Sequence, residues 1–179
     1  LYKNPASLQS FDLPFGKAHV FYPEAGEEKC TAALLLDIDA IELVRGARGR
    51  DTAATVDQYV NDRPYVASSF LSVALAQVFG SALSGKSRER QELADTAIPL
   101  QATISVVPSK GGDQILRRLF EPLGYEVRIT KYALDPHFAE WGDSPYFTLT
   151  IEKTCRLQEM LTHIYVPVSY THLRAHETK

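Results

Sequence analysis

The stretch IPLQATISVV, residues 98–107, is followed after a proline- and glycine-containing break by DQILRRLF, residues 113–120. Apolar and polar residues alternate in the first segment, which is the period of a half-buried strand. Its apolar positions are Ile98, Leu100, Ala102, Ile104 and Val106. In the second segment apolar residues recur at the spacing of one helix face. The two segments therefore predict a strand followed by a helix that packs on it.

Two more strands and a closing helix are predicted after this pair. Gly124 stands where a helix C-terminal glycine belongs, and alternation resumes at 125–130 and at 147–152. Residues 157–164 carry one apolar helical stripe. The order is strand, helix, strand, strand, helix. We expect the strand at 98–107 to pair with strands at 125–133 and 146–154.

An earlier region repeats most of this order. Strands are predicted at 17–22 and 30–38, followed by a helix from Ala40 to about Arg45. Asp39 and Glu42 have the spacing of a capping box, with Asp39 as the N-cap. The first strand and most of the first helix of this copy are missing, and residues 1–8 are interpreted as a remnant of that helix. We therefore expect a truncated N-terminus and an exposed edge on the first sheet.

A helical insert separates the two copies, and its densest apolar part is predicted to be a buried helix with Ser68 or Ser69 as cap and Gly80 as end. The fold class is α+β, with two similar units of antiparallel sheet plus helix joined by the insert. The first, truncated repeat covers 1–46, the insert 47–97 and the second repeat 98–168. Residues 169–179 are set apart as a non-native tail.

Composition describes an ordinary soluble globular protein. The 179 residues are 45% hydrophobic and 23% charged, with a net charge of −3. This composition excludes a disordered chain, and this net charge excludes a strong overall positive potential that would attract nucleic acid. A basic patch on one face is still compatible with it. No apolar run reaches a membrane span. Cys30 and Cys155 are interpreted as small apolar core residues of a reduced, cytoplasmic protein.

Residues 80–87, GSALSGKS, match the phosphate-binding loop pattern in every position. That chemistry needs a strand before the loop and a helix after it, whereas the preceding residues are better interpreted as a helix. Asp37 and Asp39 form a pair that can hold magnesium, but Glu42 favours a helix cap. The histidines of the folded region lack zinc-ligand spacing. The structure just before Gly80 discriminates between a nucleotide site and a plain loop.

The segment 59–65 is the densest cluster of polar and aromatic groups. Its candidate partner- or RNA-binding residues, together with two arginines of the basic loop 46–50, are Tyr59, Asn61, Arg63, Tyr65, Arg48 and Arg50. Tyrosine and arginine stack on single-stranded bases, and they are also enriched at protein interfaces. The alternative is a helix-entry loop that packs its tyrosines in the core.

Three long segments carry a family resemblance: FGKAHVFYPE at 15–24, QYVNDRPYVASSF at 58–70 and WGDSPYF at 141–147. They resemble the N-terminal domain of the bacterial 3′-terminal RNA ribose 2′-O-methyltransferase of the RNA-repair system. The resemblance extends from about residue 1 to about residue 168. The last residues, SYTHLRAHETK at 169–179, depart from it and look like a translated sequencing adaptor.

The resemblance implies that catalysis and partner binding belong to two different domains of the parent enzyme. The parent enzyme methylates the terminal 2′-hydroxyl with S-adenosylmethionine and a divalent metal in a separate C-terminal domain, which this chain lacks. The N-terminal domain is expected to bind the polynucleotide kinase-phosphatase-ligase and to support its ligase activity, meeting the cleaved tRNA-like 3′ ends of RNA through the complex. No catalytic residue, metal ligand or cofactor is therefore expected in this fragment. The alternatives are a nucleotide-binding protein that uses residues 80–87 and a free-standing RNA-binding module.

Overall fold

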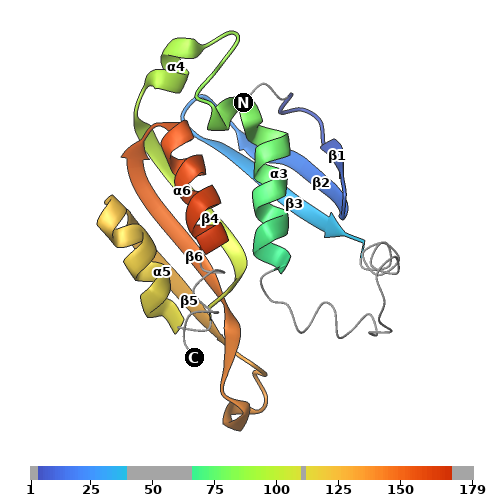
Figure 1. Cartoon of the computed structure of the whole chain (residues 1–179), viewed down its shortest axis with the longest axis vertical. Helices are drawn as coiled ribbons and strands as arrows, with labels where there is room; N and C mark the ends of the chain where they lie inside the picture. The colour runs from blue at the N-terminus through green and yellow to red at the C-terminus, as the bar shows by residue number, and fades with distance from the viewer. Residues whose placement is uncertain (1–3, 40–65, 110–111, 171–179) are drawn as a thin grey trace. The chain divides into compact units, whose positions relative to one another are not determined.

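Two separate three-stranded antiparallel sheets and four helices form the described part of the chain, which confirms the α+β class (Figure 1). The computed structural model describes residues 4–39, 66–109 and 112–170, without the side chains of 66–69, 139 and 166–170. The chain divides into two units, Leu1–Ser81 and Ala82–Lys179. No helix among these described residues is long and apolar enough to cross a membrane.

The sheet of the first unit has the order β1-β2-β3. Its strands are β1 (Gln9–Leu13), β2 (Gly16–Ala25) and β3 (Cys30–Ile38). Leu13 pairs with Gly16, so two residues close the first hairpin. Helix α3 (Val66–Leu83) packs on this sheet through two contacts. The rings of Phe15 and Phe70 stack with their centres 4.1 Å apart, and Gln77 Nε2 donates a hydrogen bond to the Asp12 carbonyl at 2.9 Å.

The predicted strands of the first unit are found, but their surroundings differ from expectation. The 17–22 and 30–38 segments pair as β2 and β3. The strand β1 was not predicted, and residues 4–8 form a turn rather than a helix remnant. Such a short strand, ended by a proline after two alternating apolar residues, gives too weak a periodic signal. Among the described residues no strand pairs with the outer edge of β3, where Leu35 is 57% exposed.

The local predictions for α3, for the helix after Asp39 and for the two cysteines have different outcomes. Helix α3 already begins at Val66, so Ser68 and Ser69 lie inside it. Its backbone leaves helical geometry at Phe79 (φ −116°, ψ 23°), one residue before the end that was predicted at Gly80. A second helical stretch follows this kink and ends at Leu83, so the predicted end corresponds to a break within α3. The predicted helix after Asp39 falls outside the described residues. Cys30 is exposed at the start of β3, whereas Cys155 is buried as expected.

The sheet of the second unit has the order β4-β6-β5. Its elements are α4 (Gln91–Asp95), β4 (Ile98–Pro108), α5 (Gly112–Phe120), the 3₁₀ turn η1 (Glu121–Leu123), β5 (Glu126–Ala133), the 3₁₀ turn η2 (Ala139–Trp141), β6 (Asp143–Cys155) and α6 (Leu157–Tyr170). The core of this unit consists of buried side chains from α5, α6, the three strands and the residue before β5: Val107, Leu116, Phe120, Tyr125, Val127, Phe147, Leu149, Ile151, Cys155, Met160 and Ile164.

The pairing order and one strand face of this unit differ from the prediction. Strand β4 pairs with β6 alone, because β6 lies between β4 and β5. Gly124 ends the helical segment as expected, with φ +82° and its amide bonded to the Glu121 carbonyl at 2.9 Å. A bulge after Ile104 shifts the register, so Val107 is buried while Val106 is 62% exposed. The prediction that the Val106 side chain faces the core is therefore wrong.

Lys153 of β6 forms hydrogen bonds with two other elements on the helix side of this sheet. Its Nζ donates to the Leu123 carbonyl of η1 at 2.9 Å and to Glu159 Oε1 of α6 at 2.6 Å. The same ammonium lies 5.2 Å from the centre of the Tyr125 ring. The hydrogen bond from Lys153 is the main cause that lowers the pKa of the Glu159 carboxyl below its ordinary value.

The lowered pKa of Glu159 predicts an acid-sensitive second unit. A carboxyl with a depressed folded-state pKa stabilises the fold above its unfolded pKa, and this stability is lost as the pH falls below about 4.5. Because the pair is partly exposed, we expect a loss of no more than ~1 kcal/mol. Urea unfolding at pH 7 and pH 3.5 measures it. The Glu159→Gln variant should lose less stability between these pH values than the parent chain; an equal loss would contradict this role.

Candidate functional site

The site predicted from sequence lies outside the described residues. Its members, Tyr59, Asn61, Arg63, Tyr65, Arg48 and Arg50, all fall within 40–65. Their role in binding a partner or RNA stays a prediction.

The phosphate-loop motif lacks its required context. Gly80 lies inside α3, so a helix rather than a strand precedes the loop. The end of the motif is used locally, because Ser87 Oγ accepts from the Arg90 amide at 3.1 Å and the Ser87 amide donates to Gln91 Oε1 at 2.9 Å. In a nucleotide site that hydroxyl would hold magnesium. The arrangement contradicts the nucleotide-binding alternative.

We expect no saturable heat when ATP and magnesium are titrated into the chain. Lys86 is exposed and belongs to a loop that follows a helix, so no backbone cradle directs its ammonium at a phosphate. Lys86→Ala should therefore give the same calorimetric trace as the parent chain. Saturable binding that disappears in Lys86→Ala would restore the nucleotide site.

No group of three or more histidine, cysteine or acidic side chains that could hold a metal occurs among the described residues. The histidines here serve local contacts. The Nδ1 atom of His163 lies 2.9 Å from Tyr125 Oη, and that of His19 lies 2.8 Å from Ser10 Oγ. Asp37 lies in β3, and the Asp39 amide donates to the Phe15 carbonyl at 3.0 Å.

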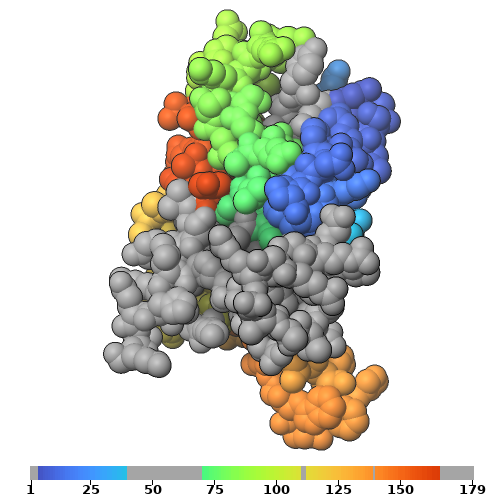
Figure 2. Space-filling model, turned by 45° about the vertical axis from the view of Figure 1, so that its right-hand side comes forward, coloured from blue at the N-terminus to red at the C-terminus, as the bar shows by residue number. Residues whose placement is uncertain are grey.

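Among the described residues of the second unit, exposed aromatic side chains gather at the end of the β5–β6 hairpin. We call its five exposed apolar side chains the aromatic tip: Tyr132, Leu134, Phe138, Trp141 and Tyr146. The rings of Phe138 and Trp141 stack with centres 4.7 Å apart and planes 14° apart. Trp141 is nevertheless 57% exposed. Figure 2 shows this part of the hairpin as an orange lobe.

Backbone hydrogen bonds fold the tip into a defined shape. The Leu134 amide donates to the Gly142 carbonyl at 2.9 Å, and the Trp141 amide donates to the Phe138 carbonyl at 3.0 Å. The Asp135 carboxylate accepts from the His137 amide at 2.7 Å, which is an Asx turn. Gly142 adopts φ +79° where the chain re-enters β6. The two stacked rings are thus presented by an ordered turn.

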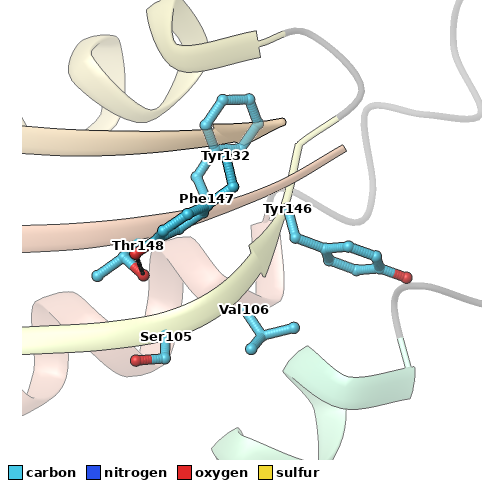
Figure 3. A pocket seen from close by; sticks show the side chains of 6 residues that line it. All are labelled: Ser105, Val106, Tyr132, Tyr146, Phe147 and Thr148. Atoms are coloured by element: carbon cyan, nitrogen blue, oxygen red, sulfur yellow. Dashed lines mark hydrogen bonds between the residues drawn. The ribbon is translucent and has the colours of Figure 1, made fainter. Parts of the chain in front are cut away.

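A hollow of about 290 Å³ adjoins this hairpin on the sheet of the second unit. Figure 3 shows its lining from three neighbouring strands: Ser105, Val106, Tyr132, Tyr146, Phe147 and Thr148. Tyr132 Oη donates to Thr148 Oγ1 at 3.0 Å. Val106 has φ +60°, a strained conformation for a β-branched residue. The bulge therefore turns an apolar side chain out of the core and into the hollow's wall.

Within the hairpin end that carries the aromatic tip, the charged side chains are acidic. Between residues 132 and 146 the chain has Asp135, Glu140 and Asp143 but no lysine or arginine. The preceding cations of β5 are both paired: Arg128 with Glu152, and Lys131 with Asp113 at 3.2 Å. The hydrogen bond from Lys131, together with its positive charge, lowers the pKa of the Asp113 carboxyl below its ordinary value. The surface thus combines exposed aromatic rings with carboxylates.

Sequence reasoning noticed part of this surface without assembling it. The segment 141–147 was singled out for its family resemblance, and alternation along 98–107 placed Val106 on the core face. The signal available was the density of Tyr, Phe and Trp over residues 132–147. Their common location depends on the bulge and on the pairing of β6 with both neighbours.

Comparison with curated proteins gives no match. A protein-family model matches residues 1–176; it is described as the RNA repair, ligase-Pnkp-associating region of Hen1. The match includes most of the segment 169–179, whose foreign origin stays a prediction. It agrees with the resemblance carried by the three segments quoted above, and it covers nearly the whole chain. The chain therefore belongs to the family of the ligase-Pnkp-associating region of Hen1.

Proposed function

We propose that this chain binds the ligase-Pnkp partner directly and raises its RNA ligase activity. The observation that carries the proposal is the family match over residues 1–176, whose description names association with that partner in RNA repair. The described residues suit a binding role, because they present an exposed aromatic surface. Methyl transfer with S-adenosylmethionine and a divalent metal is proposed to belong to a separate catalytic domain of the parent enzyme.

Mixing experiments test binding and activation separately. The purified chain and the purified ligase-Pnkp protein should elute together in size-exclusion chromatography. Ligation of a cleaved RNA should then proceed faster with the chain than with an equal amount of albumin. Co-elution without faster ligation would contradict the proposed activation but support the proposed binding. The absence of co-elution would contradict both parts of the proposal.

RNA contact is proposed to come through the complex rather than from this chain alone. The net charge of −3 supplies no general attraction to phosphate. Fluorescence anisotropy of a labelled single-stranded RNA should therefore stay flat when the chain alone is added. Saturable binding by the chain alone would favour the RNA-binding alternative.

A further inference from the structure

We propose that the aromatic tip docks onto a protein surface that presents an apolar pocket rimmed by lysine and arginine side chains. The inference rests on the proposed function, because it takes the ligase-Pnkp partner as that protein. It goes further by naming the surface of this chain that makes the contact and the chemistry of the surface that receives it.

The side chains of the tip are those that contribute most at protein interfaces. Tryptophan, tyrosine and phenylalanine bury large areas, and tryptophan and tyrosine dominate measured hot spots. Here Trp141 and Phe138 already stack on each other in a turn held by backbone hydrogen bonds. A pre-ordered pair loses little conformational entropy on binding, so most of its buried area contributes to affinity.

The hollow beside the hairpin extends the apolar surface. Tyr132 and Tyr146 belong both to the tip and to the lining of the hollow, and Val106 forms another part of that lining. Strained backbone at an exposed β-branched residue is typical of functional positions. The tip and the hollow together offer a projecting ring pair beside a recess, which is a shape that a complementary protein surface can fit.

Charge decides between a protein and an RNA occupant. Aromatic rings also stack on unpaired bases, but base-stacking surfaces are accompanied by cations that neutralise the phosphates. The tip carries Asp135, Glu140 and Asp143, and the two preceding cations of β5 are held in ion pairs. These carboxylates repel a phosphate backbone and attract a basic protein rim. The occupant is therefore a protein with lysine or arginine around its pocket.

Truncation of the ring pair tests the docking surface in the full chain. Affinity for the purified ligase-Pnkp protein is measured by calorimetry for the parent chain, Trp141→Ala and Phe138→Ala. We expect each variant to bind at least about tenfold more weakly. Leu93→Ala is the matched control, because Leu93 is an exposed leucine of α4 outside the tip. It should bind within about twofold of the parent chain.

Charge reversal provides a second test of the docking surface that keeps all aromatic side chains in place. Glu140→Lys should weaken binding and slow association, and the effect should shrink at high salt. Glu92→Lys, on α4, controls for the change in net charge and should have little effect. Circular dichroism should give the same melting temperature for all variants, since the substituted side chains are exposed.

The outcomes separate the inference from the proposed function. If the parent chain binds and the tip variants bind equally well, the docking surface is wrong and the proposed function stands. If the parent chain does not bind the ligase-Pnkp protein, both are wrong. If the parent chain binds single-stranded RNA and Trp141→Ala abolishes that binding, the tip is an RNA surface and the inference is overturned.

Discussion

Gly16→Ala should destabilise the first unit by about 3 kcal/mol or more, because backbone strain and a steric clash act together. Gly16 has φ +139° at the end of the β1–β2 hairpin. A Cβ there would lie 2.1 Å from the Asp37 carbonyl oxygen and 2.9 Å from the Asp39 amide nitrogen. Both atoms belong to the backbone, so relief requires the end of β3 to move away from β2.

Hydrogen exchange of the β2 and β3 amides measures this effect within the first unit. The matched control is Gly80→Ala, where the added Cβ meets nothing within 4 Å inside α3. It should stabilise the chain by about 0.4–1 kcal/mol, because alanine restricts the unfolded chain more than glycine does. Equal protection in Gly16→Ala and the parent chain would show that the close approach of β2 and β3 is not required.

The second large effect is expected from Leu116→Ala, with a loss of about 3–5 kcal/mol in the second unit. Leu116 is 1% exposed on the inner side of α5, where Phe120 is also buried. The substitution removes apolar contacts and leaves a cavity where the core packs on the sheet. Urea unfolding followed by circular dichroism gives the free energy.

Ile115→Ala is the control on the same helix, since Ile115 is 41% exposed. It should cost less than about 1 kcal/mol. A comparable loss in both variants would mean that the helix is held by something other than its buried face. If the second unit carries the docking surface, Leu116→Ala should also weaken partner binding in proportion to the unfolded fraction.

Periodicity in the sequence was sufficient to predict most of the strands and the helix that follows β4. The alternation of 98–107 and 125–130 is local information, and α5 has a clear apolar face at 115–120. Pairing order is not local information, so the central place of β6 could not be obtained from these patterns. The bulge that exposes Val106 adds one residue to a strand, and alternation counted along the sequence then assigns the wrong face.

The candidate site was harder to predict than the fold. The tyrosines and arginine of 59–65 drew attention because they lie close together in sequence, and they stay untested. The aromatic tip gathers residues whose exposure depends on how far the hairpin extends past its helices (Figure 1). Phe138 and Trp141 are close in sequence, but their stacking depends on the turn between them.

The middle position of β6 also orders events during synthesis. Thr103 and Thr150 face each other across the sheet and are 47 positions apart in the sequence. The β5–β6 hairpin closes a much shorter loop and can form first, whereas β4 must wait for β6. A nascent chain therefore leaves the ribosome with the pairing edge of β4 open until residue 155 has emerged. During that interval the strand can pair wrongly with other chains, which makes translation rate and chaperone supply determinants of the yield of soluble protein.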